Sequence, residues 1–420
     1  MNDEECAVRD GNIAVVGGSV AGCAAALAAA RGGAGRVTVL ERAGGRLRER
    51  GLGVTLHSDR FAELEAAGYV DAAMPWSPLH RRIWTVRDGS APLGRAVAVH
   101  TFPFRAYSWG SLWDELRRRV PEGAVYRTDT VVTAVEPDAD GVTLRLADGR
   151  GERYDAAIGA DGYRSVVRET MFPGLRPTWA GYLAWRGSCA PPPYPEESAR
   201  RQSAPDPAEA RTVLFPGGHC MMYRIPDGRG GQRLNWVLYV APPAGTDTRQ
   251  DLRTPTSLPP GGLDPELTGF LRRLVAEHFP AYWAGCVLDT PADSTLVQPI
   301  YDLEVPHYAA GRLLLAGDAA TVARPHTGGS SVKALQDAWA LETAWRSGAD
   351  WEAVTKTYDA DRTAVGATMV GLGRRLGRAQ VTEAPDWAGL TEEDLEQWWR
   401  AQHQGSEHSS GFGGHARGRA

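Results

Sequence analysis

The feature that most constrains this chain is a glycine-rich turn between two short apolar segments near its start. Residues 13–16 (IAVV) are apolar and rich in β-branched side chains, which is typical of a buried parallel strand. Residues 17–22 (GGSVAG) follow, and residues 21–30 are almost entirely helix formers. A second apolar run, residues 37–40, ends at Glu41. The order strand, glycine turn, helix, strand and acid predicts the βαβ unit that binds dinucleotides.

The residue types in this glycine turn (residues 17–22) suit a nucleotide ligand. Small residues let backbone amides approach a pyrophosphate at the positive end of a helix. The predicted pyrophosphate-binding residues are Gly17, Gly18, Ser19, Val20, Ala21 and Gly22. Glu41 can accept hydrogen bonds from a ribose and would repel a 2′-phosphate, which favours FAD or NAD over NADP. Ser19 replaces the second glycine of the usual pattern, and a parallel βαβ unit without a ligand is the alternative.

Length and composition restrict the expected number of domains, the kinds of partner and the cellular location. A chain of 420 residues is long enough for two domains, and its net charge of −5, with both signs mixed, argues against a nucleic-acid partner. The five cysteines are widely spaced, which favours free thiols in a reducing compartment and no metal site. With no signal peptide and no apolar segment long enough for a bilayer, we expect a soluble, cytoplasmic protein.

The pattern along the chain predicts an interrupted first domain. Strand-like runs rich in Trp and Tyr, without intervening helices, predict an antiparallel substrate-binding sheet in residues 176–298. We expect the nucleotide-binding domain to comprise residues 1–175 and to resume, with C-terminal helices, in residues 299–403. The low-complexity tail, residues 404–420, is expected to be disordered.

Two later motifs complete a set of three in fixed order. The Asp-Gly turn (residues 159–162, GADG) follows a strand, and Ser165 and Arg168 come after it. The Gly-Asp turn (residues 317–320, GDAA) also follows a strand and precedes the Pro-Gly turn (residues 324–330, RPHTGGS). With the glycine turn, these motifs resemble the group A FAD-dependent aromatic hydroxylases, typified by p-hydroxybenzoate hydroxylase. Residues 182–187 (YLAWRG), the GGS variant and the Pro-Gly turn are similar to the 2,6-dihydroxypyridine 3-hydroxylase branch.

The resemblance implies a fold and a set of flavin contacts. The implied fold is an α/β Rossmann-type FAD-binding domain with a β-sheet substrate domain. Asp161 is expected near FAD and the nicotinamide donor, although a helix N-cap is an equally good interpretation, and Asp318 is expected to meet the ribityl chain. The remaining cofactor-binding residues implied by the resemblance are Glu41, Arg42, Arg105, Pro325, Gly328, Gly329 and Ser330. The chain departs from the family at Thr321, where a histidine is usual, and a basic segment at residues 46–56 could face a diphosphate or solvent.

The implied reaction uses NADH or NADPH to reduce FAD, after which O2 forms a flavin C4a-hydroperoxide that attacks an electron-rich ring. The protein must exclude water and help to remove a proton from a ring hydroxyl. Strand alternation in residues 218–226 places His219, Met221 and Tyr223 on one face. Tyr223 and His326 are the catalytic candidates, although a packed strand tyrosine and a turn histidine are equally simple interpretations. The predicted substrate-binding residues are Trp185, His219, Tyr223 and Trp236.

Three functions remain open from the sequence. The first is an FAD monooxygenase, of a kind common in secondary metabolism, that hydroxylates a phenol or hydroxypyridine-like ring with O2. The second is a flavin oxidase or dehydrogenase without oxygen insertion, and the third is an NAD-binding regulator. The Asp-Gly turn favours the first, because simple NAD dehydrogenases lack it. A monomer or a homodimer is expected, with a small aromatic molecule as its partner and no nucleic acid, membrane or metal.

Overall fold

The N-terminal segment folds as the expected βαβ unit. β1 (Asn12–Val16) and β2 (Arg36–Leu40) pair in parallel, and α1 (Val20–Gly32) connects them. α1 ends at Gly33, whose φ of 105° lies in the left-handed region that glycine adopts without strain. The structure is a computed structural model, and it describes residues 10–44, 53–200, 202–244, 251–253, 257–259 and 261–403. Most of the basic segment, at residues 46–52, and the tail, at residues 404–420, lie outside the described residues.

Six strands form the first sheet, in the order β16-β17-β10-β1-β2-β6. Its further strands are β6 (Val125–Arg127), β10 (Ala156–Gly159), β16 (Ala309–Ala310) and β17 (Leu313–Leu315). β10 pairs in parallel with both β1 and β17. The carboxyl ends of parallel strands meet at one edge of a sheet, so the three turns that follow β1, β10 and β17 come to the same place.

Eight strands form the second sheet, in the order β15-β11-β14-β13-β12-β4-β5-β3. They are β3 (Gly53–His57), β4 (Ser77–Val86), β5 (Arg95–Ser108), β11 (Thr178–Cys189), β12 (Glu209–Phe215), β13 (Gly218–Pro226), β14 (Gln232–Val240) and β15 (Thr295–Asp302). The expected sheet of residues 176–298 is therefore present, but β3, β4 and β5 belong to it although we expected them in the first domain. β4 pairs in parallel with β12, a long-range contact that local patterns do not reveal.

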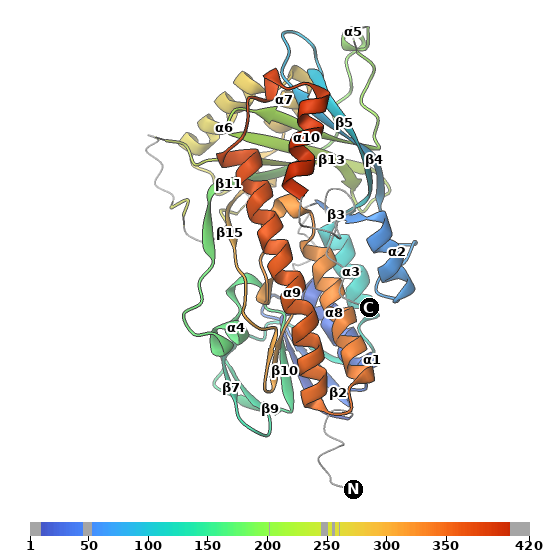
Figure 1. The fold of residues 1–420 in the computed structure, drawn as a ribbon, viewed down its shortest axis with the longest axis vertical. Helices are drawn as coiled ribbons and strands as arrows, with labels where there is room; N and C mark the ends of the chain where they lie inside the picture. The colour runs from blue at the N-terminus through green and yellow to red at the C-terminus, as the bar shows by residue number, and fades with distance from the viewer. Residues whose placement is uncertain are drawn as a thin grey trace.

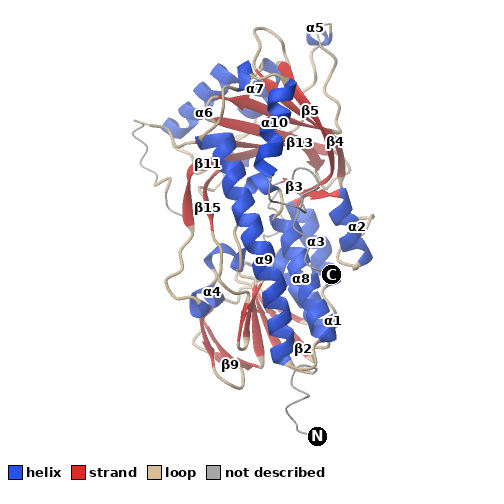
Figure 2. Cartoon of the chain, viewed as in Figure 1, coloured by secondary structure: helices blue, strands red, loops and turns tan. Residues whose placement is uncertain are grey.

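A small third sheet and the helices complete the fold (Figures 1 and 2). The third sheet comprises β7 (Val132–Pro137), β8 (Val142–Leu146) and β9 (Gly151–Tyr154). The other helices are α2 (Ser58–Ala66), α3 (Trp109–Arg119), α4 (Val166–Met171), α5 (Glu196–Ala199), α6 (Pro265–His278), α7 (Ala281–Leu288), α8 (Ser330–Ser347), α9 (Trp351–Gly377) and α10 (Glu392–His403). Figure 1 shows α9 running along the molecule from the first sheet to the second. None of the described helices combines the length and apolarity that a membrane span requires.

The two faces of the second sheet have different neighbours. One face packs against α6 and α7 through a cluster that includes Trp185, Trp236 and Trp283. The opposite face carries Tyr182 and Tyr239 and packs against the segment that follows α9. α10 covers the β4–β5 part of the sheet. The sheet therefore separates a helix-covered apolar core from a face that carries hydroxyl-bearing aromatic rings.

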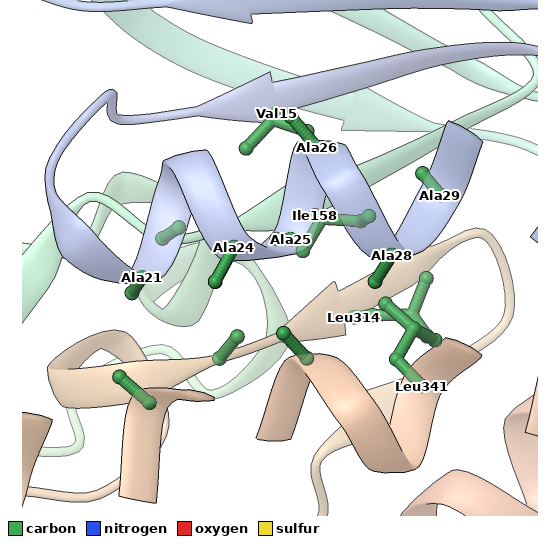
Figure 3. Close-up of a cluster of buried hydrophobic side chains, with 14 of the residues drawn as sticks. Val15, Ala21, Ala24, Ala25, Ala26, Ala28, Ala29, Ile158, Leu314 and Leu341 are labelled. Carbon is green, nitrogen blue, oxygen red and sulfur yellow. The ribbon is translucent and has the colours of Figure 1, made fainter. Parts of the chain in front are cut away.

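The alanines of α1 allow it to lie close to the sheet and to α8 (Figure 3). Ala24, Ala25 and Ala28 are fully buried, and Ala28 lies beside Leu314 and Leu341. Only small side chains leave room for this packing, and it holds the helix that follows the glycine turn against α8.

Lengthening one of these alanines is expected to destabilise the protein. Ala28→Leu should lower the free energy of unfolding by about 1–3 kcal/mol, because its added carbons find no space between α1 and α8. Urea denaturation measures the change, with the half-exposed Ala30→Leu as the matched control in the same helix. An equal cost for the two variants would contradict the close packing.

Candidate active site

The three turns identified from the sequence abut one another. A Cβ added to Gly17 would lie 2.4 Å from the carbonyl oxygen of Ala160, in the Asp-Gly turn. A Cβ added to Gly317, in the Gly-Asp turn, would lie 2.6 Å from the Cβ of Ala21. Gly17 and Gly317 also have positive φ angles, of 98° and 60°. Both positions therefore require glycine for two reasons, and the backbones meet where side chains would keep them apart.

The glycine turn presents an uncapped helix terminus beside a carboxylate. Ser19 is the N-cap residue of α1, and its hydroxyl makes no capping hydrogen bond. The carboxylate of Glu41 accepts hydrogen bonds from the backbone N–H of Gly18 (2.6 Å) and of Ala43 (2.7 Å). A carboxylate has further lone pairs, so Glu41 keeps acceptor capacity for a ligand. The helix terminus supplies donors for an anion.

The cofactor contacts predicted for Arg42 and Arg105 stay predictions. Arg42 is exposed. The guanidinium of Arg105, in β5, lies 3.6 Å from the ring centroid of Phe61 and 4.3 Å from that of Trp76. Cation–π packing between these two rings holds the guanidinium, and its expected approach to a diphosphate stays a prediction.

The helix after Arg105 does reach the glycine turn. Trp113, in α3, donates from Nε1 to the carbonyl oxygen of Gly18 (2.8 Å), and the hydroxyl of Tyr126 donates to the same oxygen (2.7 Å). A Cβ at Gly18 would lie 2.2 Å from that hydroxyl oxygen. α3 and β6 thus fix the position of the turn.

The Asp-Gly turn has a structural role that is compatible with ligand binding. Asp161 accepts a hydrogen bond from the backbone N–H of Val166 (2.7 Å), as a helix cap does. Its second oxygen is buried without a partner among the described residues, and burial raises the pKa of its carboxyl. Arg168 donates to the carbonyl oxygen of Ala319 (2.9 Å) and ties this turn to the Gly-Asp turn.

A buried ionic network holds the Gly-Asp turn from the other side. Asp337, in α8, accepts a hydrogen bond from the backbone N–H of Gly317 (2.8 Å), and Lys333 donates to the carbonyl oxygen of Gly317 (3.1 Å). Asp337 also pairs with Lys333 (2.5 Å) and with Arg362 of α9 (2.8 Å). Burial alone would lower the pKa of Lys333, but Asp337 raises it, so the amine stays charged.

Asp318, the next residue after Gly317, forms none of the ion pairs of this network. The Asp318 side chain is exposed, yet the surrounding protein removes enough hydration to raise the pKa of its carboxyl. No described residue donates a hydrogen bond to this carboxylate. The Gly-Asp turn packs against α8, which the Pro-Gly turn precedes, with Gly328 at a φ of 63° and Gly329 as the N-cap of α8. Pro325 and Ser330 belong to this turn, and Ser330 is also the first residue of α8.

These groups fit the FAD that the resemblance implies. The glycine turn leaves room for a phosphate backbone and offers helix N–H donors. Glu41 and Asp318 supply carboxylate acceptors of the kind that ribose and ribityl hydroxyls need. The glycines before α8 leave a second uncapped helix terminus.

Four rings gather beside the Pro-Gly turn, on the face of the second sheet that carries Tyr182 and Tyr239. The Nδ1 atom of His326 lies 3.3 Å from the hydroxyl oxygen of Tyr182. The His326 ring centroid lies 4.4 Å from that of Tyr239 and 5.2 Å from that of His219. Two histidine nitrogens, His326 Nε2 and His219 Nδ1, are buried without hydrogen-bond partners among the described residues.

Both histidines are held in the neutral form. Burial lowers the pKa of His326 well below its usual value, and the nearby His219, Arg324, Arg82 and Arg186 lower it further. Burial also lowers the pKa of His219 to about 3, against a hydrogen bond with the Gln380 backbone that raises it. A neutral imidazole can accept a hydrogen bond from a ring hydroxyl, and the lowered pKa makes each of these rings a weak base.

Tyr223 lies on one face of the second sheet, and the two tryptophans predicted to bind the substrate lie on the other. The alternation predicted in β13 is confirmed, since Met221 and Tyr223 share one cluster and Cys220 and Met222 share the other. Burial raises the pKa of the Tyr223 phenol, which therefore stays protonated. A Cβ on Gly53 would lie 2.8 Å from its hydroxyl oxygen.

The prediction that Trp185 and Trp236 line the substrate site is corrected. They pack on the α6–α7 side, where Trp236 Nε1 donates to Thr290 Oγ1 (2.8 Å). They are indeed buried aromatic residues of this sheet, but their alternation places them away from His326.

Several residues of the site were not identified from the sequence. They are Tyr182, Arg186, Tyr239, Lys333, Asp337 and Gln380. Alternation within residues 182–187 would have grouped Tyr182 with Arg186, but it could not say which face meets the Pro-Gly turn.

Neither the cysteines nor the cavity found in the described residues points to a different active site. Their cysteines (Cys23, Cys189, Cys220 and Cys286) are free and buried, and they contain no cluster of metal-binding side chains. A cavity lined by residues including Cys189, Asp227, Arg233 and Cys286 touches none of the predicted site residues.

Comparisons with known proteins agree with the geometry. No protein-family model matches the chain. The chain is 28% identical over 363 residues to 2,6-dihydroxypyridine 3-monooxygenase of Paenarthrobacter nicotinovorans, with 83% of each chain covered. It is 31% identical over 403 residues to 3-amino-4-hydroxybenzoate 2-monooxygenase of Streptomyces cremeus, covering 92% of this chain and 91% of that one. The fold is similar to the structure of 2,6-dihydroxypyridine-3-hydroxylase from Arthrobacter nicotinovorans, with a TM-score of 0.77, 26% identity and coverage of 90% and 95% of the two chains.

Removing the shared carboxylate of the ionic network should be strongly destabilising. Asp337→Asn leaves Lys333 and Arg362 buried with too little negative charge, so the free energy of unfolding should fall by about 3–5 kcal/mol. Asp361→Asn is the matched control, because that partner of Arg362 is partly exposed and should cost less than about 1 kcal/mol. Urea denaturation measures the free energy of unfolding of both variants. Similar losses in the two would contradict the role of Asp337 as the shared carboxylate of the network.

The buried His219 should make stability depend on pH. Its pKa is about 3 in the folded protein and about 6.5 when unfolded, so below pH 6.5 the unfolded state binds more protons. The stability that neutral His219 contributes is complete above pH 6.5 and is lost as the pH falls. Between pH 7 and pH 5 this residue should account for a loss of about 2 kcal/mol.

Urea midpoints at the two pH values measure this effect. His219→Gln should show a smaller fall than the unmodified protein, because glutamine does not titrate. An unchanged pH dependence in the variant would contradict the assignment to His219.

Proposed function

The chain belongs to the FAD-dependent aromatic monooxygenases, and from that premise we propose that its substrate is a phenol or a hydroxypyridine-like ring that lies against the ring cluster around His326. The protein is an enzyme that uses FAD, NAD(P)H and O2 to hydroxylate an electron-rich aromatic ring. The comparisons give no support to the oxidase alternative.

The observation that carries the proposal is the position of two neutral histidines among tyrosine rings beside the Pro-Gly turn. Flat rings suit an aromatic substrate, and the buried His326 Nε2 atom offers an acceptor for a ring hydroxyl. The two named relatives act on rings that carry hydroxyl groups, a dihydroxypyridine and an amino-hydroxybenzoate. A ring hydroxyl is therefore the expected common feature of the substrate.

The three turns form the proposed FAD site. We expect residues 17–22 to hold the pyrophosphate, Glu41 the adenosine ribose and Asp318 the ribityl chain. Pro325, Gly328, Gly329 and Ser330 would border the flavin ring, with the N-terminus of α8 favouring negative charge there. When bound at these residues, FAD would supply hydride acceptance from NAD(P)H and activation of O2 for insertion into the ring.

We assign proton removal to His326. Its Nδ1 atom faces the hydroxyl of Tyr182, which fixes the ring, and its lowered pKa leaves Nε2 unprotonated at neutral pH. Nε2 can then accept the proton of a substrate hydroxyl, which makes the ring carbons more nucleophilic. Tyr223 stays protonated and can donate a hydrogen bond to the substrate.

Burial protects the reaction from water. His219, Tyr182 and His326 are almost fully buried, and the segment after α9 closes over them, with the Gln380 backbone bonded to His219. We place substrate binding on the second sheet and FAD binding on the first, and we expect a cytoplasmic monomer or homodimer.

Oxygen uptake tests the proposed function. Purified, FAD-loaded protein should consume NAD(P)H and O2 faster when a hydroxylated benzene or pyridine is added, and a hydroxylated product should form in matching amount. A screen of phenols, hydroxypyridines and quinolones measures both quantities. Substrate oxidation without oxygen insertion, or no response to any ring, would refute it.

Replacing the proposed base tests its role. His326→Gln should lower kcat by about 100-fold or more while FAD stays bound, because general-base contributions are of this size. The matched control is His307→Gln, since His307 is an exposed histidine paired with Asp359 and should leave kcat unchanged. A full loss of FAD from the His326 variant, or an unchanged kcat, would contradict a role as base.

A further inference from the structure

We propose that Cys189 and Cys286 form a modification site, at which hydrogen peroxide oxidises the two thiols to a disulfide within the chain. The site lies on the α6–α7 side of the second sheet, opposite the face that meets His326. It is independent of the proposed function, because neither cysteine belongs to the proposed FAD site or substrate site.

Strand and helix periodicity direct both cysteines into one interface. In β11, Trp185 and Cys189 are an even number of positions apart and lie on the face that packs against α6 and α7. In α7, the buried residues are Trp283, Cys286 and Val287, which is the spacing of one helix face. β11 and α7 are in contact, and both cysteines belong to the same buried cluster.

Hydrogen bonds fix the end of α7 against the sheet. Thr290 donates from Oγ1 to the carbonyl oxygen of Cys286 (2.8 Å) and accepts a hydrogen bond from Trp236 Nε1 of β14 (2.8 Å). The cysteine of the helix is therefore held at a fixed place over the strands, one of which carries Cys189.

A cavity gives a small oxidant access to the two thiols. Its volume is about 590 Å³, and both cysteines line it. Exposed residues, among them Arg229, Gln232 and Asp289, line the same cavity, so a molecule of the size of hydrogen peroxide can pass from solvent to the sulfur atoms. Cys189 is 5% exposed and Cys286 is fully buried, so the oxidant meets Cys189 first.

Polar neighbours activate the Cys189 sulfur. Arg233 of β14 donates from its guanidinium to the carbonyl oxygen of Ser188 (3.0 Å), which holds a positive charge next to Cys189. Hydrogen bonding with the Cys286 thiol lowers the pKa of Cys189 against the effect of burial, and Thr290 and Arg233 lower it further. The same hydrogen bonding, together with burial, raises the pKa of Cys286. Cys189 is therefore the nucleophile, because the thiolate is the form that attacks a peroxide, and Cys286 is the resolving thiol.

One molecule of peroxide balances the reaction. The Cys189 thiolate attacks one peroxide oxygen, the O–O bond breaks, and the departing hydroxide takes the proton that this thiol had released and leaves as water. The Cys286 sulfur then attacks the sulfenic acid on Cys189, the S–S bond forms, and the displaced hydroxide leaves as a second water with the Cys286 proton. The two thiols together lose two electrons and two protons, and the peroxide is reduced.

Peptide mass spectrometry and thermal unfolding test the proposal on FAD-loaded protein that carries Cys6→Ser, a position outside the described residues. Hydrogen peroxide should join Cys189 to Cys286, with the loss of two hydrogens, about 10-fold or more faster than it oxidises the Cys220 thiol. The disulfide should raise Tm by about 2–5 °C, because it closes a loop of about 100 residues in the unfolded chain. Dithiothreitol should reverse both changes.

Cys220 is the matched control within the chain. It is buried in the same cluster and burial raises the pKa of its thiol, but it is not among the described residues that line the cavity. Cys286→Ala should abolish the disulfide and the rise in Tm, while leaving Cys189 as a sulfenic acid that dimedone traps. Cys220→Ala should leave the rise unchanged. Each Tm is compared with that of the same variant kept reduced, so a change in its basal stability cancels.

Four results would overturn the proposal. They are the absence of a disulfide between Cys189 and Cys286 after peroxide treatment, its formation between other cysteines, equal rates of oxidation at Cys189 and Cys220, and a rise in Tm that persists in Cys286→Ala. None of them bears on oxygen uptake with aromatic rings, so the proposed function is tested separately.

Discussion

The buried Asp337 carboxylate is the interaction on which the site depends. It joins Lys333 of its own helix, Arg362 of α9 and the backbone N–H of Gly317. Because Lys333 also holds the Gly317 carbonyl, both hydrogen-bonding groups of that glycine are fixed by side chains. Desolvating three charges is costly, so the network stabilises the protein only while all of its members remain paired. This couples the position of the Gly-Asp turn to the packing of two long helices.

The fixed position of the Gly-Asp turn determines what the second sheet can contact. Gly317 packs on Ala21, and α1 and the Gly-Asp turn both pack on α8, so these elements are fixed relative to one another and to the Pro-Gly turn at the start of α8. His326 stands on that turn and reaches Tyr182 and Tyr239 of the second sheet. The proposed base, His326, therefore belongs to one part of the fold and its aromatic neighbours to another, an arrangement that could hold a ring substrate and the cofactor at one interface.

Local geometry could be predicted well from the sequence. Which face of the second sheet meets the site could not. The βαβ unit, the meeting of three turns and the alternation around Tyr223 follow from short-range rules: strand period, glycine at positive φ and parallel strand order. Trp185 and Trp236 were assigned to the wrong wall because only α6 and α7, distant in sequence, determine which face becomes an apolar core. The stacking of Arg105 on Phe61 and Trp76 could not be predicted for a similar reason, since it depends on contacts between residues that are distant in the sequence.

The positive charges around His326 affect both the imidazole and any ring hydroxyl that binds beside it. Burial and nearby arginines keep the imidazole neutral, and an unprotonated imidazole is the form that can remove a proton. The same positive charge stabilises an oxyanion, so it would lower the pKa of a ring hydroxyl that approaches Nε2. In the proposed reaction a weak base would therefore suffice, because the surrounding cations would lower the pKa of the ring hydroxyl that it deprotonates. Cations that favour an anionic ring would in this way also favour the ionised hydroxyl that makes the ring nucleophilic.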